Sequence, residues 1–476
     1  MILLRITLAG CMALAMLAGC SDESPLPLTS EAINRALRTD ITDLRAQAAG
    51  VRHPALPPGE REIKAGLGPD EAAAIAILAN PSLRAIRAQR GIADAQLLQA
   101  GLLPNPSLEW TNEFPYAGPD HFIAYGIGIK WDVSALISHS AKVQAAQDRA
   151  SSVVLDIAWQ EWQVAQSARS AVYRRLSLET QLALARDVDE RLAANAATIR
   201  QAVEQQQKTG IELSAAQAAS QEAHTAVLEL QRELAKQKQA LNRLLGLPAD
   251  AEVALRQDVT LPAHLHVPAA AQLQEGVEDR RLDLLALRRG YESQQATLRA
   301  AVLSRFPKLE LGAGNARDTT KTYTFGYSLA MDLPIFDQNQ GNIAIERATR
   351  QKLFDEFTTR VFEARSDIDT AEEEIRSLNN QIAYAEESLP ALERLVSDYE
   401  HALASGNADI LSYYTIRNDL AKKRVEVLKL KQELLEVWIS LENAAGRLFL
   451  DAAQSTTLPT GGAAPPSEPA TNPGKH

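Results

Sequence analysis

A heptad pattern of apolar residues within residues 357–403 constrains the fold of this chain more than any other feature. The apolar positions recur at alternating steps of four and three: Phe357, Val361, Ala364, Ile368, Ala371, Ile375, Leu378, Ile382, Ala385, Leu389, Leu392, Val396, Tyr399 and Leu403. A mean step of 3.5 residues places one narrow apolar seam along a helix, which must coil around a partner to keep the seam buried. A helix that begins near Asn342 is about 60 residues and roughly 90 Å long. Taken alone, this stretch is typical of a coiled-coil rod.

The composition favours long helices and argues against several classes of protein. Aromatic residues make up only 5% of the 476 residues, and the net charge of −11 disfavours a nucleic-acid partner. The two cysteines, Cys11 and Cys20, precede any folded region, so the mature chain has no disulfide framework and no cysteine-based metal site. The eight histidines are scattered without ligand spacing. We expect no metal site, no catalytic residues and no bound cofactor.

The first residues are typical of an export signal. Arg5 is followed by an apolar run and then by Leu17-Ala18-Gly19-Cys20, a tetrapeptide similar to a bacterial lipobox. We therefore expect residues 1–19 to be a signal peptide and Cys20 to carry a covalent lipid; a plain secretory signal or a short anchor is the alternative. By resemblance to other lipoproteins, Ser21 after the cysteine favours the outer membrane.

Residues 20–69 are rich in proline, glycine and charge and are expected to drape over the protein, with one helical patch near residues 31–49. A helix follows with Asp70 as its N-cap, and Pro81 should break or kink it. The spacing of the apolar residues then changes from 3.6 to 2 residues, which predicts two strands at about 106–114 and 122–132. In each strand, apolar residues alternate with polar or small residues. A hairpin that lies on the core of a soluble protein shows the same alternation and is the alternative interpretation.

Long helical patterns resume after this hairpin. One expected helix runs from about Ala135 to Thr209, where Gly210 ends it as a C-cap, and a second runs to Leu245. Residues 249–279 form a connector. In the later heptad helix, Pro390 removes one backbone hydrogen bond and is expected to bend the helix. The bend is either a tolerated kink or, as a hypothesis, marks the place where a tube of helices meets an equatorial belt.

The whole series of elements then occurs a second time. Residues 280–450 repeat the plan of residues 70–248, with strands expected at about 307–315 and 323–333. The landmark pairs lie about 200 residues apart: Pro106 and Pro307, Gly210 and Gly406, Gly246 and Gly446. Residues 451–476 are expected to be a disordered tail.

The strands have the length and pattern of strands that cross an outer membrane. About ten residues suffice for a tilted membrane strand, and the apolar faces carry aromatic residues as membrane barrels do: Trp110, Phe114, Tyr125, Trp131, Tyr323, Phe325 and Tyr327. Four strands cannot close a barrel, and an open edge in lipid leaves backbone groups unsatisfied. Three chains would supply twelve strands, continued by a tube of helices.

The chain resembles the TolC family of outer-membrane factors, the exit ducts of tripartite efflux systems. The resemblance covers residues 70–447 and is carried by Gly210, Gly406 and three motifs: Asn80-Pro81-Ser82-Leu83, Ala100-Gly101-Leu102-Leu103-Pro104-Asn105-Pro106 and Asp332-Leu333-Pro334-Ile335-Phe336-Asp337. Residues 333–343 are most similar to the cobalt-zinc-cadmium (CzcC-like) branch. The implied fold is mainly α with membrane β: a trimeric barrel of twelve strands continued by a coiled-coil tunnel.

The resemblance also implies a location, partners and sites. The chain would be a homotrimeric duct in the outer membrane, with its tunnel in the periplasm, working with a periplasmic adaptor and an inner-membrane RND pump. Gly210, Gly406 and Asp409 would lie at the periplasmic tip that meets the adaptor. The positions where the family often has an acidic aperture are near Ser412 and Thr415 here, and Asp409 or Asp419 would substitute.

Three functional interpretations remain open from the sequence. The first is a duct for heavy-metal cations, the second a duct for drugs or other organic solutes, and the third a lipid-anchored periplasmic coiled-coil scaffold or adaptor. Adaptors have one helical hairpin beside a lipoyl-like or β-barrel domain, whereas this chain has two strand hairpins within a duplication. No constellation of residues favours an enzyme.

Overall fold

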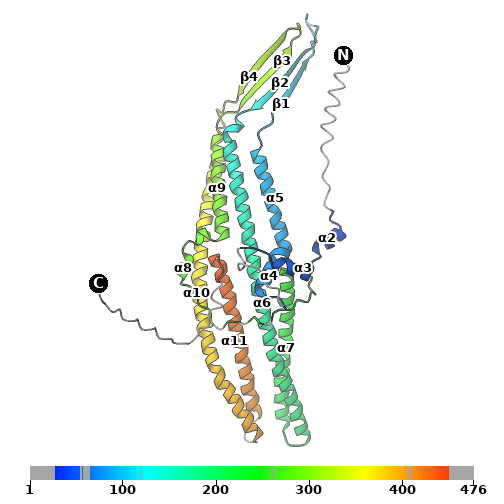
Figure 1. Ribbon diagram of the computed structural model, residues 1–476, viewed down its shortest axis with the longest axis vertical. Helices are drawn as coiled ribbons and strands as arrows, with labels where there is room; N and C mark the ends of the chain where they lie inside the picture. Colours follow the sequence, from blue (N-terminus) through cyan, green and yellow to red (C-terminus); the bar gives the residue numbers. More distant parts are fainter. Residues whose placement is uncertain are drawn as a thin grey trace, which may run out of the picture.

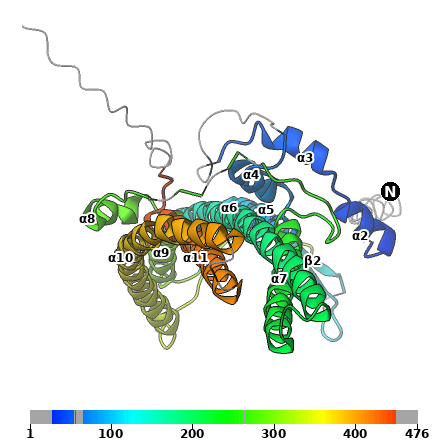
Figure 2. The same cartoon turned by 90° about the horizontal axis from the view of Figure 1, so that it is seen from below.

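The computed structural model describes residues 27–53, 56, 65–119, 121–256, 258–259, 261–262, 264–405, 408 and 410–449. A four-stranded sheet lies at one end, and long helices run from it to the other end (Figure 1). Seen along the long axis, the long helices follow a curved layer, with α3 and α4 on its convex side (Figure 2). The expected signal peptide, Cys20 and the tail at 451–476 lie outside the described residues.

Two short helices, rather than one, occupy the expected helical patch in the N-terminal segment. α2 spans Ser30–Leu37 and α3 spans Ile41–Ala48, and the side chains of Thr29 and Asp40 cap their first turns. Arg45 of α3 pairs with Glu71 of α4 at 2.6 Å, and the Thr39 hydroxyl donates to the Gly246 carbonyl at 2.9 Å. These contacts hold the segment against the helical body.

The next two helices are separated at the predicted proline, but the first begins earlier than expected. α4 spans Pro69–Ala79 with Gly68 at its N-cap, so the prediction that Asp70 is the cap is wrong. Proline is favoured at the first helical position because its missing N–H is not needed there. Asn80 caps α5, Pro81–Gly101, by accepting from the Ser82 N–H at 3.0 Å.

The sheet is antiparallel and follows the chain order. β1 (Ser107–Glu113), β2 (Ala124–Asp132), β3 (Leu309–Arg317) and β4 (Tyr323–Met331) pair in the order β1-β2-β3-β4. Each strand lies within two residues of its expected range. The two hairpins, about 200 residues apart in the chain, meet where Gly128 lies opposite Gly314.

Two antiparallel pairs of long helices lead away from the sheet. α6 (Ala135–Glu204) has 70 residues and pairs with α7 (Gly210–Leu244), while α10 (Gln340–Ala404) has 65 and pairs with α11 (Ile410–Ala445). The predicted seam of α10 is buried from Ala364 to Ala385, with exposed fractions of 0–6%. Beyond Pro390, which lies inside α10, the seam residues are only half-buried. None of the described helices combines the length and the apolar character needed to cross a lipid bilayer.

The duplication is also visible in how each helical pair returns to the middle of the molecule. After α7, Gly246 has φ +66° and lies so close to Ala79 that a Cβ would come 2.4 Å from the Ala79 carbonyl oxygen. After α11, Gly446 has φ +65°, and a Cβ there would lie 3.0 Å from the Arg281 Cα. Both turns therefore require glycine, for their left-handed backbone and for their close approach to the end of α4 or the start of α9.

The connector carries short helices of its own. α8 (Ala270–Gln274) and the 3₁₀ helix η1 (Val277–Asp279) precede α9 (Leu282–Leu303). Gln274 donates to the Asp369 carboxylate at 2.7 Å, and the Asn379 amide donates to the Leu265 carbonyl at 3.0 Å. The connector is thereby fastened to the middle of α10.

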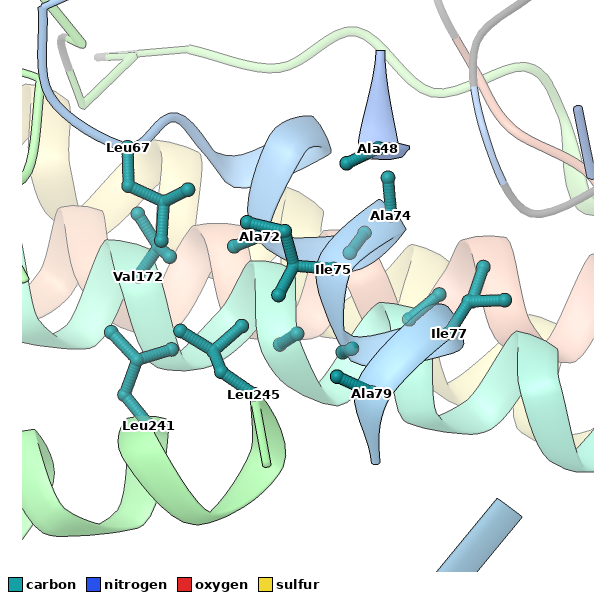
Figure 3. Close-up of a cluster of buried hydrophobic side chains, with 14 of the residues drawn as sticks. Ala48, Leu67, Ala72, Ala74, Ile75, Ile77, Ala79, Val172, Leu241 and Leu245 are labelled. Atoms are coloured by element: carbon teal, nitrogen blue, oxygen red, sulfur yellow. The ribbon is translucent and has the colours of Figure 1, made fainter. Parts of the chain in front are cut away.

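The apolar core lies at the level of these crossings. One cluster joins α3 and α4 to α6 and α7, with Ile75 and Leu241 fully buried between them (Figure 3). A second cluster joins the connector and α9 to α10 and α11 around Ile368, Ile375 and Leu441. Alanines dominate α4, which lets its backbone approach α6 closely.

Candidate functional site

One face of the sheet is apolar across all four strands. The register places Trp110 opposite Ile127, Trp131 opposite Leu311, and Leu311 opposite Leu329. The large apolar side chains of this face are exposed or half-buried: Leu108, Trp110, Tyr125, Ile127, Ile129, Trp131, Leu311, Tyr323, Phe325, Tyr327, Leu329 and Met331. An exposed apolar surface of this extent marks a partner or a membrane rather than water.

The opposite face carries small and charged residues. Gly128, Gly314 and Gly326 lie side by side across three strands, and a Cβ on Gly314 would come 2.8 Å from the Ile127 carbonyl oxygen. Lys130 and Glu109 form an ion pair across the first hairpin at 2.6 Å. This face is therefore polar and leaves room beside the sheet.

The outer strands β1 and β4 each have one edge that no other described strand covers. A sheet edge presents unpaired N–H and C=O groups, which readily pair with another strand. The sheet of one chain is therefore open at both sides.

The turn between α6 and α7 lies at the far end of the molecule from the sheet (Figure 1). α6 ends at Glu204, and Gly210 is the first residue of α7, so the prediction that Gly210 is a C-cap is wrong. Thr209 and Glu212 form a capping box instead. Hydrogen bonds from Lys208 and Thr209 lower the pKa of Glu212 to about 2.

The turn between α10 and α11 lies at the same end. Two of the expected tip residues, Gly406 and Asp409, lie outside the described residues. Ser412 is half-buried, and Thr415 and Asp419 are exposed, all three within the first three turns of α11. Their expected role at an aperture stays a prediction.

A cluster that the sequence analysis missed lies beside these residues. The Tyr413 hydroxyl donates to Glu400 of α10 at 2.7 Å, and Arg417 donates to both Tyr413 and Glu400. Burial, together with the contact to Glu400, raises the pKa of Tyr413. Burial also raises the pKa of Tyr414 to about 12, so both phenols stay neutral at physiological pH. The sequence feature that could have indicated this cluster is the pair of adjacent tyrosines, Tyr413 and Tyr414, in a chain with few aromatic residues.

A groove of about 750 Å³ separates the two helical pairs below the core. Its apolar floor comes from α6, with Leu178 and Leu192, and its rim carries Glu222 of α7 and Lys422 of α11. These two rim residues approach to 3.9 Å, and Arg174 of α6 pairs with Glu436 of α11 at 2.6 Å. These charged contacts join the two helical pairs along the groove.

A buried charged network joins the two repeats at the level of the core. Arg169 of α6 pairs with Glu442 of α11 at 2.5 Å and with Asp70 of α4 at 3.2 Å, and Gln166 donates to Glu442 at 3.1 Å. Burial alone favours the neutral guanidine, but the two carboxylates outweigh it and raise the pKa of Arg169. The network is a structural tie rather than a reactive site.

The described part of the chain holds no group of histidine, cysteine and acidic residues that could bind a metal ion. What the geometry provides is a wall: an apolar face, an opposite face of small and charged residues, and long helices in line with the strands.

The fold is that of outer-membrane channel proteins. The structure of CusC matches with a TM-score of 0.67, at 17% identity over 83% of this chain and 98% of that one. VceC of Vibrio cholerae gives 0.65, at 16% identity over 80% and 96%. The outer-membrane channel OprN gives 0.68, at 13% identity over 90% and 98%. A search of curated protein sequences finds no match.

The sequence of the second repeat agrees with this fold. Residues 274–447 match the family model described as "Outer membrane efflux protein". The expected fold class, mainly helical with four antiparallel strands, is confirmed. The chain therefore has the fold of TolC-like outer-membrane channels, and its second repeat is similar to the outer membrane efflux protein family.

Proposed function

We propose that three copies of this chain form the outer-membrane channel of a tripartite efflux system of the RND type. The observation that carries the proposal is the apolar face, which is continuous over four strands and ends at two open edges. In lipid, such edges must be paired, and three sheets joined edge to edge make a closed barrel of about twelve strands. The apolar face then contacts lipid and the small polar face lines the lumen.

Transport through this channel is passive, because nothing in the described wall couples to an energy source. The long helices continue the barrel as a tube, whose far end would meet a periplasmic adaptor and, through it, the inner-membrane pump. Gly210, Gly406 and Asp409 would contact the adaptor there, and Ser412, Thr415 and Asp419 would lie close to the aperture. A lipid on Cys20 would add a second attachment to the outer membrane.

We infer that the substrates are heavy-metal cations. The support is the resemblance of residues 333–343 to the cobalt-zinc-cadmium branch, together with the charges on the small polar face. Within the strands, that face carries Lys130 against four acidic residues: Glu109, Glu113, Asp132 and Glu310. A lumen with excess carboxylates favours cations.

The decisive test is the oligomeric mass of the detergent-purified protein together with its single-channel conductance. A conducting trimer with cation-selective reversal potentials is expected, and Glu310→Gln should reduce that selectivity. A monomer without conductance would refute the shared barrel and favour the periplasmic scaffold. For the substrate, a strain lacking the chain should become sensitive to cobalt, zinc or cadmium salts; sensitivity to organic toxicants alone would favour a duct for organic solutes.

A further inference from the structure

A cationic and aromatic cluster lies at the loop end of the sheet, farthest from the helices. Arg317, the last residue of β3, is directly opposite Tyr125 of β2 and Tyr323 of β4. Its guanidinium carbon lies 5.9 Å from the ring centroids of Tyr125, Tyr323 and Phe122. The Lys321 ammonium lies 3.7 Å from the Phe122 centroid. We call these five residues the loop-end cluster.

The loop-end cluster belongs to the apolar face of the sheet. Arg317 and Leu311 are six residues apart on β3, so their side chains lie on the same face of the sheet. The residues opposite Arg317 on the neighbouring strands are Tyr125 and Tyr323. β2 and β3 are the two central strands, so a neighbouring sheet joined at an edge would not cover Arg317. The guanidinium is thus presented on the outer side of the wall.

The cations of this cluster have no ion-pair partner among the described residues. Over the described residues, no carboxylate forms an ion pair with Arg317 or Lys321, and the Arg317 Nε is buried without a hydrogen-bond partner. The adjacent acid, Asp318, accepts the N–H groups of Thr320 and Thr322 at 2.9 and 2.8 Å and so shapes the turn. The side-chain hydrogen bond from Thr320 and, to a smaller extent, the Arg317 charge lower the pKa of Asp318 without a direct ion pair. The two cations and this adjacent acid together keep one net positive charge to meet an anion from outside.

The height of the cluster identifies what surrounds it. Arg317 lies eight residues along β3 from Leu309, roughly 26 Å at about 3.3 Å per residue. The apolar band of a membrane barrel is about 25 Å tall, and a strand tilt of about 40° reduces these roughly 26 Å to about 20 Å of height. Arg317 therefore lies in the outer part of the band, level with Tyr125 and Tyr323, and aromatic rings of this kind mark the border with the headgroups. An arginine facing lipid is costly at the midplane and tolerated at this border, where headgroups begin.

We propose that the loop-end cluster binds the phosphate of a phosphorylated glycolipid in the outer leaflet. The guanidinium offers paired donors that match phosphate oxygens, and the lysine ammonium adds a second positive charge. The aromatic rings sit where such rings prefer to lie, with one end in hydrocarbon and the other in the headgroup layer. The inference rests on the proposed function, because it requires the sheet to lie in the outer membrane.

The test measures the thermal stability of the full-length oligomer in detergent, with added diphosphoryl lipid A or phosphatidylcholine. We expect lipid A, but not phosphatidylcholine, to raise the melting temperature of the oligomer by several degrees, because it binds only the folded state. The double variant Arg317→Gln/Lys321→Gln should keep the oligomer but lose this shift. Lys308→Gln, which removes a lysine near the opposite end of β3, is the matched control and should keep the full shift.

Three results would overturn the proposal. The first is a full shift in the double variant, and the second is no shift in the wild-type protein. The third is an equal shift with inorganic phosphate alone, which would indicate a site for a free anion. If the wild-type protein still forms a conducting trimer, these results leave the proposed channel intact. A protein that neither oligomerises nor conducts would instead refute the channel and this inference together.

Discussion

Arg169 shows how a single residue ties the two repeats together. Its guanidinium lies between Asp70 of the first repeat and Glu442 of the second, and Glu442 is only 1% exposed. In Arg169→Met, Glu442 would remain buried without its cation, which we expect to cost about 3–5 kcal/mol of unfolding free energy. Chemical denaturation of the detergent-solubilised protein measures this loss.

Arg174→Met is the matched control for that prediction. Arg174 lies on the same helix and pairs with Glu436 of α11, but both side chains are partly exposed. Loss of a partly exposed ion pair costs about 0–1 kcal/mol, because water and salt already screen it. Equal destabilisation by the two variants would contradict the view that burial makes the Arg169 network important.

The lowered pKa of Glu212 predicts that the stability of the α6–α7 turn depends on pH. Its pKa of about 2 lies below the ordinary value of 4.5, because Lys208 and Thr209 hydrogen-bond its charged form. A carboxylate with a lowered folded pKa stabilises its surroundings above the ordinary value, and this contribution is lost as the pH falls through the folded pKa. We expect the α6–α7 turn to stay protected at pH 5 and above, and to fray progressively between about pH 4 and pH 2.

Hydrogen exchange of peptides covering the α6–α7 turn, corrected for intrinsic rates, measures that fraying. Glu212→Gln is the control, since it cannot titrate and should remove the pH dependence specific to this turn. A profile that is the same in the wild type and in this variant would show that the capping box does not govern the turn.

At the residue scale, the sequence predicted chemical character better than exact position. The heptad period correctly identified which residues of α10 are buried. The N-cap of α4 was predicted wrongly, because the helix begins at Pro69, two residues before a cap at Asp70 would allow. Gly210 begins α7 because Thr209 and Glu212 form a capping box. The pairing of Tyr413 with Glu400 was not predictable, since it depends on how α10 and α11 are aligned.

At the element scale, regular periods made most helices and all four described strands predictable. Alternation in the strands and heptads in α10 reflect burial on one side, which a sequence records directly. The short helices of the connector follow no such period, because their contacts to α10 through Gln274 and Asn379 are local and polar. The pairing of β2 with β3 joins distant segments, and no local pattern in the sequence records it.

Pro390 is the element-scale feature with the clearest consequence. It lies eleven residues beyond Asn379, where the connector is fastened, or roughly 16 Å farther along the helix. The expected coincidence of a bend at Pro390 with an equatorial belt stays a prediction. Because an interior proline costs a helix about 3 kcal/mol, Pro390→Ala should raise the melting temperature and straighten α10.

Conductance and melting temperature should be measured together for Pro390→Ala. A straighter α10 would shift the α10–α11 turn at the aperture, so we expect altered single-channel conductance along with higher stability. Ser388→Ala, two residues away, is a control without a proline effect. Unchanged stability, assembly and efflux in Pro390→Ala would mean that the bend is tolerated and has no function.

At the scale of the whole molecule, the structure of one chain is incomplete. The helices form a curved layer rather than a closed bundle, and the sheet ends in two open edges (Figures 1 and 2). Both features arise from the duplication, since each repeat supplies one strand hairpin and one helical pair and neither hairpin closes a sheet. Copies of the same chain would complete the sheet and the helical layer together.

An exposed aromatic stripe on α10 predicts where a neighbouring copy packs. Phe362 and Tyr384 are 72% and 75% exposed and lie 22 residues apart, about six turns, so they share one side of the helix. That side is not the seam buried against α11. We expect Phe362→Glu to prevent trimer formation while leaving the helical content of the chain unchanged, because a charge would replace an aromatic ring at a contact between copies.

Size-exclusion chromatography with light scattering and circular dichroism checks this expectation. Glu363→Gln is the control, since Glu363 is next in sequence but is exposed and pairs only with Arg360 of its own helix. If Phe362→Glu remains a trimer with normal conductance, the stripe faces the lumen or the solvent rather than a neighbour. The joining of the chains would then depend on the open edges of β1 and β4, where hydrogen bonds between backbones leave side-chain substitutions little influence.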